Sequence, residues 1–213
     1  MSENYLNIIA EDRIYPIIRD KDPDRTLETA KALIDGGIRV LEINVEAPEI
    51  YDVIKEVSKH AAVCAGGIIT ATQADYAFKS GAQLFASPIF QMNMVKISKN
   101  LRIPFIAGTT TANEAYNAWK SRIQLIKIFP AEAMGGVQYI ESILKQMPFL
   151  NLMPTGDIKL HDVVSYLNSG AVAVGVGRDF YSGFTPKEIT KRAKEILIEV
   201  KDFTQWNKKS ISL

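Results

Sequence analysis

The sequence alternates eight times between a short, mostly β-branched run and a segment whose apolar residues recur at helical spacing. Because the strand runs are nearly continuous in apolar character, they are typical of a parallel sheet that is covered on both faces. Thr72, Thr111 and Thr185 stand at or near the starts of three segments, where a hydroxyl accepts hydrogen bonds from unpaired amides. The expected strands are 14–19, 40–45, 62–66, 84–87, 104–107, 125–129, 150–154 and 171–176, and the expected helices lie near 24–35, 48–59, 72–80, 91–100, 112–120, 137–147, 161–168 and 186–201. This alternation predicts βαβ architecture.

Two folds fit such an alternation, a closed eight-stranded barrel and an open doubly wound sheet. The open sheet normally carries a glycine-rich turn after its first strand. Here that strand ends in Arg19-Asp20-Lys21-Asp22-Pro23, without glycine. We therefore predict a (β/α)8 TIM barrel as a single domain over residues 1–213, with its core at about 10–200 and one short helix before Ile14.

Composition excludes several classes of protein. The 25 Lys and Arg nearly balance 24 Asp and Glu, which argues against a nucleic-acid binder that works by counterion release. No apolar run approaches the roughly 18–20 residues that span a bilayer, and the N-terminus shows no secretory signal. The single cysteine, Cys64, forbids an internal disulfide and fits a reducing compartment. We expect a cytoplasmic protein without nucleic-acid or membrane partners.

Lys127 is a charged residue inside an apolar strand run, Leu125 to Phe129. Burial disfavours the charged form of a lysine and lowers its pKa, and a Schiff-base lysine needs its neutral amine to attack a carbonyl. In the alternative, Lys127 faces a helix and extends to solvent. Strand side chains alternate between the two faces of a sheet, and the sequence does not determine which face Lys127 occupies.

Glu42 is the second charge within a strand run, between Leu41 and Ile43. If it points inward, strands 2 and 6 contribute to the same barrel layer, and Glu42 and Lys127 meet across the barrel. A glutamate there can move protons during Schiff-base formation. The alternative is a structural ion pair without chemistry.

The strand ends carry candidate substrate-binding residues. Arg19 ends strand 1 and suits a substrate carboxylate, or else a salt bridge to Asp20 or Asp22. Glycine turns follow strands 3, 7 and 8 at Gly67, Gly156 and Gly177, and the last two stand where barrels often bind phosphate, although such turns are also ordinary. Asp157 would repel a phosphate there, whereas Arg178 would anchor an anion or neutralise Asp157.

The remaining chemistry-bearing residues indicate no metal site. His60 and His161 fall in or beside helices and are expected at the surface, and Cys64 is expected to fill space in strand 3. Two histidines and one cysteine give no metal-ligand cluster.

Taken in order, these motifs resemble the class I aldolases of 2-keto-3-deoxy-6-phosphogluconate and 4-hydroxy-2-oxoglutarate, with the related 6-phosphogalactonate enzymes. The resemblance covers about residues 10–200 and is strongest in IKIFPAEAMGG (126–136) and GGIRVLEI (36–43). Weaker matches are CAGGIIT (64–70), ASP (86–88), IPFIAGTTT (103–111), PTGD (154–157) and GVGRDFY (175–181).

The resemblance implies a metal-free, cofactor-free barrel, usually a homotrimer, that cleaves a 2-keto-3-deoxy sugar acid to pyruvate and an aldehyde in carbohydrate metabolism. It places the Schiff-base lysine on Lys127 and the proton-shuttling acid on Glu42. It places substrate contacts on Arg19, Gly67, Pro88, Phe129, Gly156, Asp157, Gly177 and Arg178.

Three departures from the family pattern concern the substrate. Many gluconate-type members carry an arginine for the carboxylate at the position of Glu46. Galactonate-type members also lack this arginine, and they keep an arginine at the end of strand 1. Gly67 replaces a threonine, Asp157 replaces the second of two glycines, and Arg178 replaces a small residue. Two other functions stay open: a non-catalytic barrel that binds a small anionic metabolite, and another phosphate-handling barrel such as an isomerase, which would need no lysine at position 127.

Overall fold

A computed structural model describes the backbone of residues 5–206 and the side chains of residues 5–201. Eight parallel strands form one sheet in the order β7-β6-β5-β4-β3-β2-β1-β8. The ring is completed by a parallel bridge between Thr155 and Gly175, and by the Val172 amide, which donates to the Leu152 carbonyl at 2.9 Å. The predicted TIM barrel is confirmed.

The strands agree with the sequence-based expectation in number and position. They are β1 (Ile14–Ile18), β2 (Val40–Asn44), β3 (Ala62–Gly66), β4 (Leu84–Ser87), β5 (Phe105–Thr109), β6 (Ile126–Ile128), β7 (Leu152–Pro154) and β8 (Val174–Val176). Nearly every strand residue is buried, as expected for strands that face the barrel interior on one side and helices on the other.

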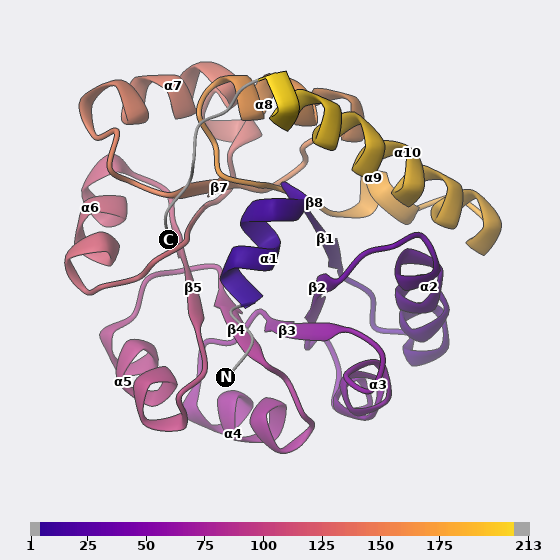
Figure 1. The fold of residues 1–213 in the computed structure, drawn as a ribbon. Coiled ribbons are helices and arrows are strands. Elements are labelled where there is room, and N and C mark those ends of the chain that lie inside the picture. The colour runs from indigo at the N-terminus through magenta and orange to yellow at the C-terminus, as the bar shows by residue number, and fades with distance from the viewer. Residues whose placement is uncertain (1–4, 207–213) are drawn as a thin grey trace.

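Most of the helices surround this ring, whereas the first lies across its centre (Figure 1). The helices are α1 (Tyr5–Asp12), α2 (Pro23–Asp35), α3 (Ile50–Val57), α4 (Ala71–Lys79), α5 (Met92–Leu101), α6 (Ala112–Lys120), α7 (Gly136–Gln146), α8 (Val163–Asn168), α9 (Arg178–Tyr181) and α10 (Pro186–Trp206), with 3-10 turns at Glu132–Met134 and Leu160–Asp162. The expected N-terminal helix is α1. The sequence did not predict α9, which follows β8 directly.

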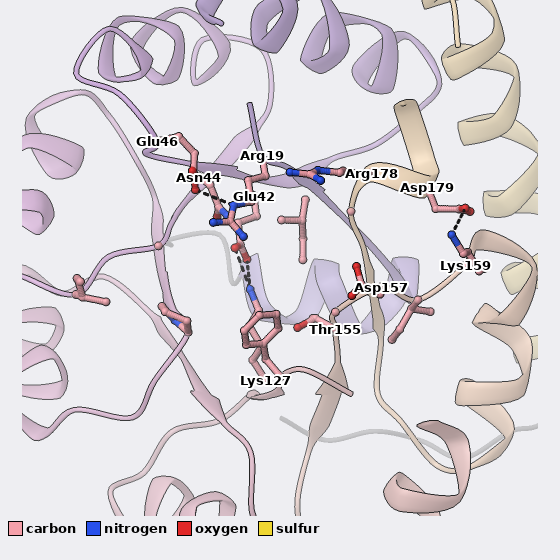
Figure 2. Close-up of a pocket in the computed structure, with 18 residues that line it drawn as sticks. Arg19, Glu42, Asn44, Glu46, Lys127, Thr155, Asp157, Lys159, Arg178 and Asp179 are labelled. Atoms are coloured by element: carbon pink, nitrogen blue, oxygen red, sulfur yellow. Dashed lines mark hydrogen bonds and ion pairs between the residues drawn. The ribbon is translucent and has the colours of Figure 1, made fainter. Parts of the chain in front are cut away.

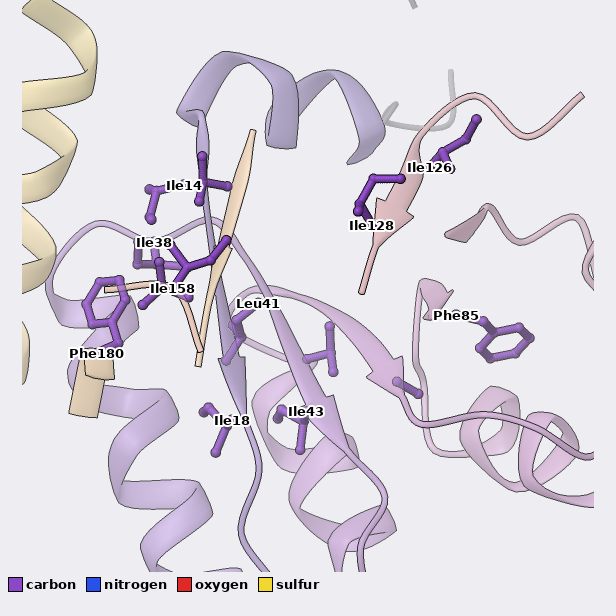
Figure 3. Close-up of a cluster of buried hydrophobic side chains, with 14 of the residues drawn as sticks. Ile14, Ile18, Ile38, Leu41, Ile43, Phe85, Ile126, Ile128, Ile158 and Phe180 are labelled. Atoms are coloured by element: carbon purple, nitrogen blue, oxygen red, sulfur yellow. The ribbon is translucent and has the colours of Figure 1, made fainter. Parts of the chain in front are cut away.

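The apolar residues form two cores on the two faces of the sheet. The outer core joins strand residues such as Ile18, Leu41 and Ile43 to the helices (Figure 3). The inner core fills the barrel and includes Leu6 and Ile9 of α1. Because α1 lies across the centre of the ring in Figure 1, it closes the amino ends of the strands and leaves only their carboxyl ends open.

No helix within residues 5–206 is long and apolar enough to cross a membrane.

Candidate active site

A cavity of about 520 Å³ opens at the carboxyl ends of the strands. Its walls come from seven of the eight strand ends and the loops that follow them (Figure 2). Every candidate site residue from the sequence lines it, together with side chains that the sequence did not single out. The lining residues are Ile17, Arg19, Glu42, Asn44, Glu46, Gly67, Ile69, Pro88, Lys127, Phe129, Thr155, Gly156, Asp157, Ile158, Lys159, Gly177, Arg178 and Asp179.

Lys127 and Glu42 meet inside the barrel at the base of this cavity (Figure 2). Lys127 Nζ lies 2.9 Å from Glu42 Oε1 and 3.1 Å from Oε2. The two residues are 7% and 1% exposed. Both side chains therefore point inward from β6 and β2, and the alternative in which Lys127 extends to solvent is wrong.

The neighbouring strands make room for this pair and keep it free of other charges. A Cβ at Gly66 would lie 2.5 Å from Glu42 Oε1 and 2.0 Å from Asn44 Oδ1, so only glycine lets these two side chains occupy the site. Burial, followed by the charge of Glu42, raises the pKa of the Cys64 thiol. Burial also raises the pKa of the Tyr15 phenol, again with Cys64 and Glu42 adding to the effect. Both groups stay neutral beside the ion pair, and Cys64 is buried as predicted.

Arg19 stands at the rim of the cavity. Its Nε donates to Glu46 Oε1 at 2.9 Å, and its backbone amide donates to the Tyr181 hydroxyl at 2.9 Å. Asp20 pairs with Arg25 instead, at 3.0 Å. The expected salt bridge from Arg19 to Asp20 or Asp22 is not formed, because Arg19 bonds to Glu46 instead.

The turns after β7 and β8 form the neighbouring wall of the cavity, because β8 pairs directly with β1. Gly156 and Asp157 both have left-handed backbones, with φ of 102° and 57°. Lys159 Nζ lies 3.2 Å from Asp179 Oδ1. Among the described residues no ion pair joins Arg178 to Asp157, so the expected neutralisation does not occur; Figure 2 shows Arg178 reaching toward Arg19.

Several lining residues were missed from the sequence. Asn44 carried a usable signal, because it follows Glu42 by two positions on the same strand and therefore shares its face. Its buried Oδ1 has no hydrogen-bond partner in the structure. Lys159 and Asp179 carried none, since they approach only after the barrel brings the turns of β7 and β8 together.

The described residues hold no group of three or more His, Cys, Asp or Glu that could bind a metal ion. The His60 and His161 side chains are both exposed, as predicted, and lie outside the cavity.

A family model for KDPG and KHG aldolase matches residues 6–193, which is most of the chain. The chain belongs to the KDPG and KHG aldolase family. Relatives in this family are named as aldolases, which are carbon–carbon lyases. This chain is therefore an enzyme of the carbon–carbon lyase class.

Individual members of the KDPG and KHG aldolase family match over most of their length. A 2-dehydro-3-deoxy-phosphogluconate aldolase of Haemophilus influenzae is 31% identical over 78% of this chain and 80% of its own. A 2-dehydro-3-deoxy-6-phosphogalactonate aldolase of Escherichia coli is 26% identical over 78% and 82%. The crystal structure of a 2-keto-3-deoxy-6-phospho-gluconate aldolase from Zymomonas mobilis is 26% identical, covers 88% of this chain and 94% of its own, and superposes with a TM-score of 0.80.

Proposed function

We propose that this protein is a class I aldolase that cleaves a 2-keto-3-deoxy sugar acid to pyruvate and an aldehyde through a Schiff base on Lys127. The observation that carries the proposal is the buried contact between Lys127 and Glu42 at the base of the cavity. The family match supports the reaction class. A single aldolase domain is part of the proposal, supported by the one eight-stranded sheet of the described residues.

Schiff-base formation needs a neutral amine and a place for its proton. Glu42 Oε1, at 2.9 Å from Lys127 Nζ, takes that proton. The free amine attacks the C2 keto carbon, and the resulting carbinolamine loses its hydroxyl as water after Glu42 returns a proton. The product is an iminium that links Lys127 to C2.

The iminium then accepts the electrons of the breaking carbon–carbon bond. Glu42, through water, removes the proton of the C4 hydroxyl, C4 becomes the aldehyde carbonyl, and the C3–C4 electron pair moves into the enamine. Protonation at C3 and addition of water to C2 release pyruvate and restore Lys127. The electron sink is the protein's own nitrogen, and no metal or cofactor enters any step.

The rest of the cavity positions the substrate. Arg19 is our candidate for the keto-acid carboxylate, while Gly67, Pro88 and Phe129 line the wall around Lys127. Gly156, Asp157, Gly177 and Arg178 form the part that receives the leaving aldehyde. The related proteins are named for phosphogluconate, phosphogalactonate and KHG substrates, and we propose a substrate of this keto-acid class.

A homotrimer in the cytoplasm is a further part of the proposal and follows from the family resemblance. Light scattering after size exclusion would then give a mass of about three times 23.7 kDa.

Borohydride trapping with pyruvate tests the Schiff base. Intact mass should show a stable pyruvate adduct on the wild type and on Lys145→Met, an exposed lysine in α7 that serves as control. The adduct should be absent from Lys127→Met. A wild type without adduct would support the other candidate, a non-catalytic barrel that binds a small anionic metabolite.

A further inference from the structure

Asp157 brings a carboxylate to the cavity wall without a charged partner. The turn holds it there, because Gly156 and Asp157 adopt successive left-handed backbones, a conformation that aspartate tolerates better than most residues. Among the described residues, Asp157 makes no ion pair and its carboxylate accepts no hydrogen bond.

No neighbouring cation forms an ion pair with Asp157 within the described residues. Lys159 pairs with Asp179 at 3.2 Å, and Asp179 also accepts from the Leu160 amide at 2.9 Å and lies 3.8 Å from Arg192 Nη2. Arg178 has no ion pair within the described chain, but its guanidinium extends toward Arg19 and not toward the Asp157 carboxylate (Figure 2). The Asp157 carboxylate is exposed at the cavity wall and is therefore accessible to a bound ligand.

A phosphate monoester suits this place poorly. It carries about −1.5 to −2 charges at pH 7, and its oxygens would have to share the turn with a carboxylate that is already charged. Sugar hydroxyls suit it well, because a carboxylate accepts strong hydrogen bonds from neutral O–H donors.

We propose that Asp157 makes the far end of the cavity a site for free hydroxyl groups, so that the substrate is an unphosphorylated 2-keto-3-deoxy sugar acid. This inference rests on the proposed function, since it concerns the part of the substrate that becomes the aldehyde. It sets the chain apart from relatives whose names specify a phosphorylated acid.

The test compares cleavage of two 2-keto-3-deoxy-gluconates that differ only in a 6-phosphate, with pyruvate release as the readout. The wild type should show the higher kcat/KM for the unphosphorylated acid. Asp157→Asn removes the charge, fits the same backbone, and should raise kcat/KM for the phosphorylated acid by about ten- to a hundredfold. Asp157→Gly also removes the acceptor and should lower kcat/KM for the unphosphorylated acid by a similar factor, about tenfold or more.

Asp162→Asn is the matched control, because it removes the same charge five residues along the chain, outside the cavity. Its ratio of kcat/KM values for the two acids should equal that of the wild type. A wild type that traps pyruvate but favours the phosphorylated acid, or cleaves neither, overturns this inference alone. An Asp157→Asn variant with the same ratio of kcat/KM values as the wild type also overturns this inference. Failure of the wild type to trap pyruvate overturns the proposed function.

Discussion

Lys127 and Glu42 place two opposite charges in an otherwise apolar barrel, and each compensates the buried charge of the other. Removing one partner leaves the other buried without compensation, which costs about 3–5 kcal/mol. Glu42→Gln should therefore lower the free energy of unfolding by about this amount, while Lys127→Met/Glu42→Gln should lose less than the sum of the two single variants. Urea unfolding of all three gives the coupling.

The exposed pair Lys59–Glu56, at 2.5 Å, is the control for that experiment. Its double-mutant cycle should give a much weaker coupling than the buried pair, because solvent screens an exposed ion pair. If the buried pair were no more strongly coupled than this exposed one, the contact at the base of the cavity would contribute little to holding the side chains in place.

Arg19 tests the assignment of the substrate carboxylate. Arg19→Ala should raise KM for the keto acid by about ten- to a hundredfold and change kcat much less. The reason is that a residue holding the carboxylate stabilises the bound substrate and the transition state equally. Steady-state kinetics measure both constants. Arg25→Ala is the matched control, since Arg25 pairs with Asp20 outside the cavity.

Arg178→Ala completes the comparison. An unchanged KM in Arg19→Ala together with a raised KM in Arg178→Ala would move the carboxylate site from Arg19 to Arg178. The two guanidinium groups lie on the same side of the cavity, so kinetics can separate roles that their placement leaves close together (Figure 2).

At the scale of elements, the sequence predicts best where the local pattern is long. The sequence predicts all eight strands and the eight helices that follow them, because apolar runs and helical spacing are local properties. The four-residue helix α9 was not, since one turn has no periodicity to detect. Thr70, and not Thr72, caps α4, because the helix begins one residue earlier than expected and Gln73 completes the capping box.

Long-range pairing is what the sequence leaves open. The facing of Lys127 and Glu42 depends on the period-two register of β6 and β2, and closure of the ring decides it. The partner of Arg19 lies 27 residues away, on the loop after β2, and nothing local to Arg19 predicts it.

The capping box at the start of α6 makes a prediction on pH. Hydrogen bonds from the Thr111 and Thr110 amides hold the pKa of Glu114 below its ordinary value of 4.5. A lowered pKa in the folded state stabilises the fold above pH 4.5, and this contribution is lost as pH falls through the folded pKa. Glu114→Gln should lower the free energy of unfolding by about 0.3–1 kcal/mol near pH 7. This difference from the wild type should shrink on acidification.

Chemical unfolding at pH 7, 5 and 3 measures this difference. Glu141→Gln is the control, because it removes an exposed carboxylate from the middle of α7, away from the helix cap. A Glu114→Gln difference that grew toward low pH would contradict the role of the ionised carboxylate in the cap.

At the scale of the whole molecule, α1 fills the amino end of the barrel and Ile9 is fully buried there. Ile9→Ala leaves a cavity among the inner core residues and should lower the free energy of unfolding by about 2–5 kcal/mol. Ile198→Ala, on a side chain that is 62% exposed in α10, should change it by less than about 0.5 kcal/mol. Thermal or urea unfolding compares the two variants.

Pyruvate trapping on Ile9→Ala checks that the barrel is still assembled. The adduct should form below the unfolding transition, because Lys127 lies toward the open end of the barrel. Loss of the adduct from a folded Ile9→Ala would mean that the α1 packing also sets the geometry of the cavity.

The closure of one barrel end by α1 also gives the molecule a front and a back. A surface or a carrier protein attached at the exposed Asn7 of α1 would lie on the side of the barrel away from the substrate entrance. An immobilised form of this enzyme, tethered through that side, would present its entrance to the flowing solution and should keep the turnover rate of the free enzyme.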